Sequence, residues 1–414
     1  MANDFDHSNR LDFEQPATKE SGLPDSHTSN AGDRAAGFEI LPNFQRFNQR
    51  NDVFSRSFWD PTIRSPKTER FYQTYRQPLR QWRKVDGFTQ KDYALRNASW
   101  HVTDILAELK EAEDRREGFL DEFSVQRAGP EEKLEVGSPA EMSAEIKHVA
   151  KLFGADLVGI THIDRRWLYT HKYSAQTQTA KPNDLPIGLE HVIVVAQEMA
   201  YDLIQTVPSA LSGTATGLGY SKDVVVLLCI AQYIRNLGYQ AVASLNDTAL
   251  AIPFAIQAGL GEYGRHGLLI TREFGPRVRL GKIFTDLPLT HDHPTRFGVR
   301  EFCEVCRRCT QACPPQAISN FIPTDQIHNQ SNISGVRKWT VDGEKCFNFW
   351  ANQNSDCSIC IRVCPYNKDY RKWYHRLGRR LAGTRLRKLL LKLDVWLGYG
   401  ARKPSNLWWT GVNG

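Results

Sequence analysis

Eight of the nine cysteines in this 414-residue chain lie between residues 303 and 364 and form two sets. The first set has the spacing C-x2-C-x2-C-x3-C-P and consists of Cys303, Cys306, Cys309 and Cys313. The second set has the spacing C-x10-C-x2-C-x3-C-P and consists of Cys346, Cys357, Cys360 and Cys364. Thiolates are soft ligands that suit iron–sulfur clusters or zinc. The first spacing is that of bacterial ferredoxins, in which three cysteines hold one 4Fe–4S cluster and the fourth reaches the other.

The spacing therefore predicts two 4Fe–4S clusters with crossed ligands. We expect one cluster on Cys303, Cys306, Cys309 and Cys364. We expect the second cluster on Cys313, Cys346, Cys357 and Cys360. Two zinc sites are the alternative, but zinc usually takes paired C-x2-C or Cys/His sets, which two crossed sets ending in Cys-Pro fit poorly. Two clusters that lie close together conduct electrons, so the rest of the chain is expected to hold a group that is reduced.

A glycine-rich loop, Gly259-Leu-Gly261-Glu-Tyr-Gly264, matches the pattern G-x-G-x-x-G. A dinucleotide site needs a strand before this pattern and a helix after it. Here a helical segment, IPFAIQA, precedes the loop and a strand-like segment, HGLLIT, follows it, so we do not expect NAD binding. The glycines through Gly267 instead predict a backbone that comes close to a flat or bulky ligand.

The composition is that of a large globular protein. The hydrophobic content is 41%, and the length suggests two or three domains. The longest clean apolar run is VVVLLCIA, residues 224–231, which is shorter than the roughly 18 residues of a membrane helix. Neither a secretory signal pattern nor a twin-arginine leader is visible at the N-terminus. We therefore expect a cytoplasmic location, where reduced thiols favour metal binding over disulfides.

The net charge of +7 is concentrated near the C-terminus. Residues 371–403 contain eleven Lys or Arg residues and one acidic residue, Asp394, so the rest of the chain is mildly acidic. The basic tail, residues 371–414, suits docking of an acidic electron donor or peripheral contact with a membrane surface. A solvated helix that only covers the cluster domain is the simpler alternative.

The hydrophobic pattern divides the chain before this tail into four parts. Residues 1–46 are polar and show no sustained period, which predicts disorder. Residues 47–138 are expected to form an extended arm on the core, followed by helices. Residues 139–300 alternate buried strands with helices, and residues 301–370 hold the cysteine sets. The expected fold class is α+β, with a layered α/β sandwich followed by a cluster domain.

Periodicity also predicts the individual elements of the sandwich. Buried strands are expected at residues 155–163, 191–199 and 239–243. Helices are expected at residues 100–123, 138–155, 221–238 and 248–260. Residues 266–286 are expected to form strands joined by a turn.

Three stretches together resemble the corrinoid-dependent reductive dehalogenases. They are GLGYSKD (217–223), the continuous segment from SLNDTALAIPF to GKIFTDLPL (244–289), and the double ferredoxin motif. The resemblance covers about residues 140–370. It implies a nitroreductase-like α/β domain that encloses base-off cobalamin, followed by a ferredoxin-like domain with two 4Fe–4S clusters. It also implies an enzyme that replaces a carbon-bound halogen by hydrogen.

The resemblance assigns a catalytic tyrosine to Tyr220, an active-site asparagine to Asn246 and a basic partner to Arg279. A phenol with a pKa near 10 is a competent proton donor if a cation such as Arg279 stabilises the phenolate. Taken singly, the three residues would be a core tyrosine, a helix cap and a surface arginine. The resemblance also assigns the corrinoid pocket to a short list of residues in the glycine-rich segment: Gly259, Gly261, Gly264, His266 and Gly267.

Only about 50 residues follow Cys364, so we expect an external electron donor, a ferredoxin or flavodoxin with its reductase. The expected substrate is a small organohalide, without nucleic acid. Two alternatives remain: a cobalamin and iron–sulfur reductase of the epoxyqueuosine type that acts on tRNA, and a ferredoxin-like electron carrier. The basic tail suits tRNA, whereas the tyrosine of GLGYS departs from the acidic proton donor of epoxyqueuosine reductases.

Overall fold

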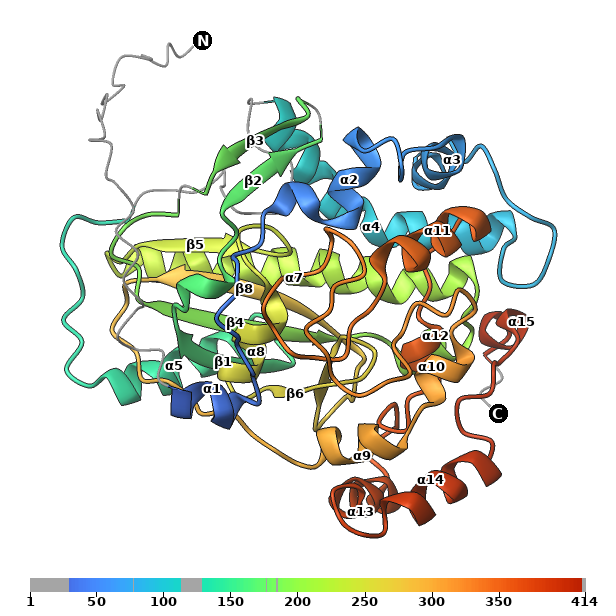
Figure 1. Cartoon of the computed structure of the whole chain (residues 1–414). Helices are drawn as coiled ribbons and strands as arrows, with labels where there is room; N and C mark the ends of the chain where they lie inside the picture. The colour runs from blue at the N-terminus through green and yellow to red at the C-terminus, as the bar shows by residue number, and fades with distance from the viewer. Residues whose placement is uncertain (1–29, 77, 113–128, 176, 184, 412–414) are drawn as a thin grey trace.

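The computed structural model describes residues 30–411, apart from residues 77, 113–128, 176 and 184. At the centre of the protein lies a four-stranded antiparallel sheet with the strand order β1-β4-β8-β5 (Figure 1). Its strands are β1 (Leu157–His162), β4 (His191–Glu198), β8 (Val278–Thr285) and β5 (Ala241–Ser244). The three strands expected between residues 155 and 243 are therefore confirmed.

Two smaller sheets flank the central one. In one of them β2 (His171–Ser174) pairs with β3 (Thr179–Pro182), and in the other β6 (Gly261–Tyr263) pairs with β7 (Leu269–Thr271). The expectation that residues 266–286 form strands joined by a turn is confirmed, although β7 and β8 belong to different sheets. The turn between them packs so tightly on the cluster domain that a Cβ on Gly275 would lie 2.0 Å from the carbonyl oxygen of Tyr366. The turn between the two sheets therefore lies directly on the cluster domain.

The longest helix, α7 (Ala210–Asn236), covers one face of the central sheet (Figure 1). It begins at Ala210 instead of the expected Ser221, because the side chain of Ser209 caps it by accepting a hydrogen bond from the Ser212 amide at 3.0 Å. By length and composition alone α7 could cross a membrane, but 61% of its most apolar window is buried inside the protein, as in the core helix of a globular domain.

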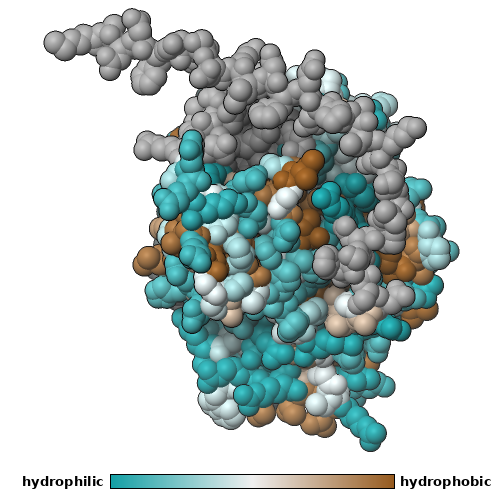
Figure 2. All heavy atoms as spheres, turned by 90° about the vertical axis from the view of Figure 1, so that its left-hand side faces the viewer, coloured by the Kyte–Doolittle hydropathy of each residue, from teal (hydrophilic) through white to brown (hydrophobic). Residues whose placement is uncertain are grey.

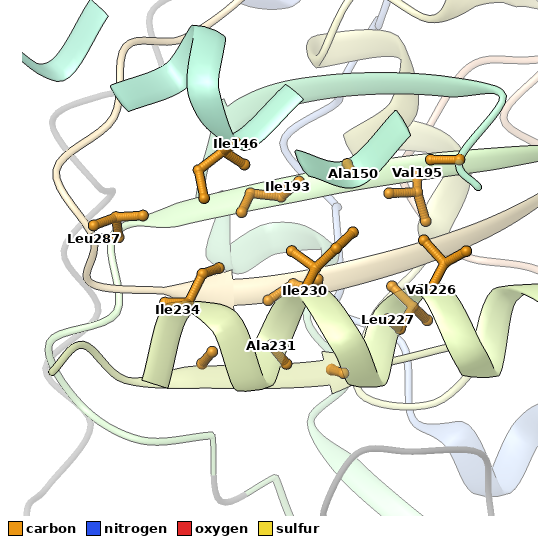
Figure 3. Packing of buried hydrophobic residues seen from close by; sticks show 14 of the residues in the cluster. Ile146, Ala150, Ile193, Val195, Val226, Leu227, Ile230, Ala231, Ile234 and Leu287 are labelled. Carbon is orange, nitrogen blue, oxygen red and sulfur yellow. The ribbon is translucent and has the colours of Figure 1, made fainter. Parts of the chain in front are cut away.

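The main core lies between α7, the sheet and α5 (Pro139–Leu152). Figure 3 shows Leu227, Ile230 and Ile234 of α7 on one side of Ile193 of β4, with Ile146 of α5 on its other side. These side chains are fully buried, so each contributes roughly 1.5–3 kcal/mol of transfer free energy. The opposite face of the sheet is covered by α8 (Ala251–Gln257), which is shorter than expected, and by η2 (Arg165–Trp167).

The N-terminal segment is part of this second core. Residues 30–46 contain α1 (Asn30–Ala36), and Phe38 and Phe44 pack edge-on against Trp167 with ring centroids 5.1 and 5.8 Å away. The expectation of disorder through residue 46 is therefore wrong for residues 30–46, while residues 1–29 lie outside the described chain. The segment lacks a hydrophobic period because it binds through isolated aromatic side chains.

Residues 47–112 are largely helical, so the expectation of an extended arm is wrong. They form η1 (Gln49–Asn51), α2 (Val53–Trp59), α3 (Pro66–Gln73) and α4 (Gln90–Ala112). The helix α4 packs along α7 and begins before the expected residue 100. Residues 113–123 of the expected helix lie outside the described residues.

The cysteine-bearing part packs against the end of the sheet that is opposite to α5 (Figure 1). Its helices are α9 (Val299–Val305), α10 (Arg308–Ala312), α11 (Gly343–Gln353) and α12 (Ile359–Arg362). The short α6 (Tyr201–Gln205) contacts α12 from the sheet domain. The basic tail folds into α13 (Trp373–Ala382), α14 (Arg387–Trp396) and α15 (Ser405–Trp409).

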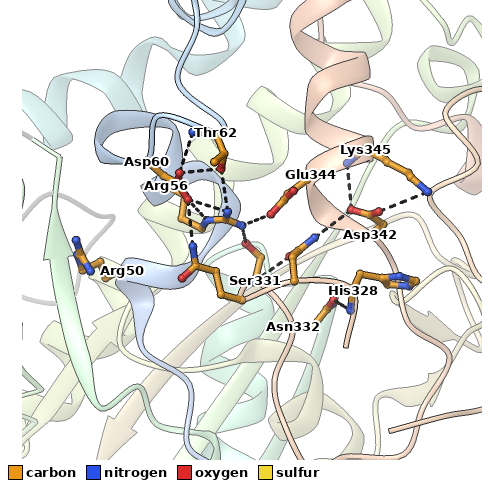
Figure 4. A network of polar contacts seen from close by, with 12 residues as sticks. Arg50, Arg56, Asp60, Thr62, His328, Ser331, Asn332, Asp342, Glu344 and Lys345 are labelled. Carbon is orange, nitrogen blue, oxygen red and sulfur yellow. Dashed lines mark hydrogen bonds and ion pairs between the residues drawn. The ribbon is translucent and has the colours of Figure 1, made fainter. Parts of the chain in front are cut away.

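A buried ion-pair network joins the N-terminal helices to the cluster domain (Figure 4). The guanidinium of Arg56 in α2 contacts Asp60 at 2.7 Å and Glu344 of α11 at 2.6 Å. It also donates a hydrogen bond to Ser331 at 2.9 Å. The Arg56 and Asp60 side chains are only 3% and 7% exposed, so each depends on the other for compensation of its charge.

The first prediction concerns this network. Replacing Arg56 by Ala leaves Asp60 buried without its cation, and we expect a loss of about 3–5 kcal/mol in stability. The matched control is Arg64→Ala, which removes a pair with Glu69 that is 54% and 55% exposed. That pair contributes about 1 kcal/mol or less. Thermal unfolding midpoints would measure both variants, and equal shifts would contradict the role assigned to Arg56.

Candidate active site

Tyr220 lies in the middle of α7 and is 6% exposed. Its phenolic oxygen accepts hydrogen bonds from the Asn246 amide and from the Arg279 guanidinium. Asn246 lies in the loop after β5 and is exposed, whereas Arg279 lies in β8 and is partly exposed. The structure therefore brings together the three residues assigned to catalysis from the sequence. Two donors on one phenolic oxygen, one of them a cation, stabilise a phenolate.

A glycine makes this contact sterically feasible. A Cβ on Gly219 would lie 2.5 Å from Cγ of Arg279, so any larger residue would displace the arginine. The guanidinium carbon of Arg279 lies 4.0 Å from the centroid of the Tyr220 ring, within cation–π distance. The indole of Trp100 in α4 packs on the same ring with a centroid distance of 4.8 Å. Sequence reasoning missed Trp100, since it follows no motif.

Gln197 is a second residue that the motifs did not indicate. It lies opposite Arg279 in the β4–β8 register, so the two side chains share one face of the sheet. Gln197 is fully buried, and neither its Oε1 nor its Nε2 has a hydrogen-bond partner among the described residues. The same holds for Nε of Arg279 and for Nε1 of Trp100. Buried polar atoms normally have partners, so this group suits a ligand with polar edges.

The first group of cysteines is gathered under the C-terminal helices. Burial raises the pKa of Cys364 well above its usual range, and the neighbouring Cys303, Cys306 and Cys309 raise it further. A buried thiol with a raised pKa stays protonated unless a metal takes the place of the proton. These four residues are the ones that the crossed spacing assigns to one cluster.

The second group contains the other four cysteines. Burial, followed by Cys346 and Cys313, raises the pKa of Cys357 to about 12. For Cys360, Cys309 of the first group is also among the neighbours that raise the pKa, so the two groups are adjacent. Among the described residues, no three His, Cys, Asp or Glu side chains are placed to hold a single ion. A cubane binds each thiolate to a different iron, so its ligands stand further apart than those of one zinc ion.

The second group lies against α7. Asp356, which precedes Cys357, accepts a hydrogen bond from Thr216 of α7 at 3.2 Å. A Cβ on Gly213 would lie 2.4 Å from the Asp356 carboxylate, so this contact also requires a glycine. Thr216 is about one helical turn before Tyr220. The helix therefore connects the surroundings of the second cysteine group to the tyrosine.

Comparison with known proteins yields matches in both parts of the chain. Residues 173–289 match the model of the reductive dehalogenase subunit, and residues 302–367 match the 4Fe–4S double cluster binding domain. A tetrachloroethene reductive dehalogenase from Desulfitobacterium hafniense is 39% identical over 319 residues, 68% of this chain and 57% of that protein. An epoxyqueuosine reductase from Cellulophaga algicola is 29% identical over 155 residues, 34% of this chain and 44% of that protein.

The fold comparison agrees. A reductive dehalogenase structure that suggests a mechanism for B12-dependent dehalogenation superimposes with a TM-score of 0.68 and 21% identity, covering 88% of this chain and 48% of that chain. The chain belongs to the reductive dehalogenase family. It spans little more than half the length of the curated relative, 57%.

The double-cluster match confirms the prediction of two 4Fe–4S clusters in this member of the family. Which cysteine binds which cluster stays a prediction. The α+β fold class is confirmed at the level of the family fold.

The glycine-rich segment of this dehalogenase-family chain is a β-hairpin after α8, and it lacks the strand–loop–helix order of a dinucleotide site, as expected. Its glycines lie close to other parts of the chain. A Cβ would lie 3.0 Å or less from His293 at Gly259 and from Ile270 at Gly261. The same holds for His266 at Gly264 and for Val341 at Gly267. Contact of these glycines with a corrinoid stays a prediction. His266 is 5% exposed, burial lowers its pKa to about 4, and its Nε2 has no partner among the described residues.

Two surface cavities lie away from the tyrosine. One, of about 460 Å³, is lined by residues 80–84 with Tyr93 and Asn354. The other, of about 320 Å³, lies between α6 and residues 398–403. Neither is lined by the three catalytic candidates. The candidate active site is therefore identified by the hydrogen bonds to Tyr220 and by the buried polar atoms without partners around it, and not by either cavity.

Buried charges lie behind the tyrosine. Asp223, one turn after Tyr220, is fully buried, and its carboxylate has no hydrogen-bond partner among the described residues. Burial raises its pKa to about 8, opposed by the charges of Arg279 and Lys282. Lys282 is also fully buried and donates a hydrogen bond to the Leu245 carbonyl. The sequence signal for Asp223 was its position directly before the apolar run VVVLLCIA (224–231).

The second prediction concerns Asp223. Its folded-state pKa of about 8 lies above the ordinary value of 3.8, so between these values the folded chain keeps a proton that the unfolded chain has lost. Stability from this group is full below about pH 4 and falls as the pH rises toward 8, by up to about 1.4 kcal/mol per unit.

Asp223→Asn removes this dependence, so we expect the variant to gain thermal stability over the wild type as the pH rises from about 5 to about 8. Thermal midpoints across this range would measure the difference. Glu131→Gln, at an exposed position, is the control for loss of a carboxylate. Parallel pH profiles for Asp223→Asn and wild type would contradict the raised pKa.

Proposed function

We propose that this chain is a reductive dehalogenase that catalyses R–X + 2e⁻ + H⁺ → R–H + X⁻. The observation that carries the proposal is the phenolic oxygen of Tyr220, which accepts hydrogen bonds from both Arg279 and Asn246. Family membership and the double-cluster domain supply the context, because electrons must reach the carbon–halogen bond.

A base-off cobalamin is the cofactor that we propose for the bond cleavage. The unpaired buried atoms of Gln197, His266 and Arg279 support this choice, since a corrin ring carries amide groups on its edge that both donate and accept. When bound, reduced cobalamin would supply electrons to the carbon–halogen bond, which no side chain can do. We also propose that the surrounding sheet domain is nitroreductase-like.

The side chains then have separate roles. Tyr220 delivers the proton to the carbon that loses halide, and Arg279 stabilises the phenolate that remains. The exposed amide of Asn246 lies beside the phenolic oxygen and orients the substrate. Trp100 packs on the tyrosine ring and excludes water from one side of it.

The substrate class follows from the curated relative, which is named a tetrachloroethene reductive dehalogenase. We propose chlorinated alkenes as the first substrates and halogenated phenols as the second. A ferredoxin or flavodoxin in the cytoplasm is proposed as the electron donor. The epoxyqueuosine reductase alternative is less favoured, since that relative matches a smaller part of the chain at lower identity.

The third prediction tests the cofactors and the proton donor. Protein made with cobalamin and purified without oxygen should contain about eight iron and one cobalt per chain. Tyr220→Phe should keep both metals and lose on the order of 10²–10⁴-fold in turnover of chlorinated ethenes, because the general acid is gone. Eight iron without cobalt would leave an electron carrier. Cobalt with tRNA-dependent turnover alone would favour the epoxyqueuosine alternative.

The fourth prediction tests the placement of Arg279. Gly219→Ala should push the arginine away from Tyr220 and lower turnover by on the order of 10²-fold, with iron and cobalt contents unchanged. Gly137→Ala is the matched control, because a Cβ there meets nothing within 4 Å. Full activity of Gly219→Ala would show that the contact between Arg279 and Tyr220 is dispensable.

A further inference from the structure

The C-terminal helical hairpin, defined as residues 371–397, exposes an unusual amount of apolar surface. Nine of the large apolar side chains that are exposed in the described part of the chain lie within it. The most exposed are Trp396 at 80% and Trp373 at 67%, followed by Val395 and Leu397 at 57% and Leu389 at 54%. The side of the molecule at the left of Figure 1 is mostly hydrophilic by contrast (Figure 2).

The same surface is strongly basic. Residues 371–392 contain nine Lys or Arg residues and no acidic residue, and Arg376, Arg380, Lys388 and Lys392 are among the exposed ones. The one acid of the hairpin, Asp394, is 8% exposed and faces inward, where it pairs with Arg308 and, at 2.6 Å, with Lys368. The outer face therefore combines cations with apolar side chains and carries no exposed carboxylate of its own.

The hairpin is held firmly against the first cysteine group. Ala382, with Leu390 and Leu391, packs into the cluster of buried residues that contains Cys303 and Cys364. Arg308, which donates to Asp394, directly precedes Cys309 and also donates to the Tyr399 carbonyl at 2.5 Å. A surface fixed in this way presents a defined face, unlike a free basic tail.

We propose that this hairpin binds peripherally to the anionic surface of a phospholipid bilayer. Interfacial helices combine Lys and Arg with Trp and Leu, because the aromatic and aliphatic groups enter the headgroup region while the cations meet anionic lipids. An acidic carrier protein would match the charge but would leave two highly exposed tryptophans unexplained, since transient electron-transfer interfaces are small. Docking places the first cysteine group next to the bilayer, because the hairpin packs directly on it.

The experiment uses the full chain with its clusters and vesicles of phosphatidylcholine, with or without phosphatidylglycerol. We expect co-sedimentation with the anionic vesicles only, and a decrease as salt is added. Trp373→Ser with Trp396→Ser should abolish binding. Replacing Arg380, Lys388 and Lys392 by Gln should weaken it about fivefold per cation removed.

The matched controls lie outside the hairpin. Trp82→Ser, at a side chain 41% exposed, and Lys84→Gln, at an exposed position, should bind vesicles as the wild type does. Unchanged iron content and cluster absorbance would show that each variant is folded. The proposal is overturned if the wild type ignores anionic vesicles, or if the hairpin variants bind like the controls. Binding of a reduced ferredoxin in the absence of any vesicle binding would assign the surface to a carrier protein instead.

Discussion

The burial of α7 is the constraint on which the rest of the structure depends. Within seven residues, three glycines of this helix each admit a different element: Gly213 meets the Asp356 loop, Gly217 meets Trp100 of α4, and Gly219 meets Arg279 of β8. Each glycine costs the helix about 1 kcal/mol relative to alanine, so the close contacts and the apolar face packed on the sheet must offset that cost. Cluster domain, N-terminal helices and sheet therefore converge on one stretch of helix, and Tyr220 directly follows it.

Electrostatics then decides what Tyr220 can do. Arg279 stabilises a phenolate only to the extent that no other anion neutralises it in the low-dielectric interior. Asp223 is the anion that could neutralise Arg279. It lies on the same helix as Tyr220 and is close enough to interact with Arg279. Because burial raises the pKa of Asp223 to about 8, its carboxyl is mostly neutral at pH 7 and leaves the charge of Arg279 to the phenol. In the proposed mechanism, the neutral carboxyl of Asp223 thus leaves Arg279 to support Tyr220 as the proton donor.

The residues of the candidate site could be predicted from the sequence more fully than the packing of the elements around them. Cysteine spacing and the GLGYS, LNDTA and GPRVRL segments carry strong local signals, and Tyr220, Asn246 and Arg279 do meet in the structure. Trp100 and Gln197 belong to no motif, because their proximity to the site arises only when α4 packs on α7 and β4 pairs with β8. The order in residues 30–46 was missed for a similar reason, since single aromatic side chains bind Trp167 without any period. The positions of Trp100, Gln197 and residues 30–46 depend on contacts between distant parts of the chain. A local sequence pattern does not contain that information.

The same long-range contacts give the electron path a direction. The first cysteine group lies under the C-terminal hairpin, and Cys360 of the second group has Cys309 of the first as a neighbour. The second group is tied to α7 through Asp356 and Thr216, about one turn before Tyr220. Electrons that enter beneath the hairpin would therefore reach α7 through the second group. The predicted crossing of ligands, in which each cluster takes one cysteine from the other set, would keep the two clusters adjacent along this path.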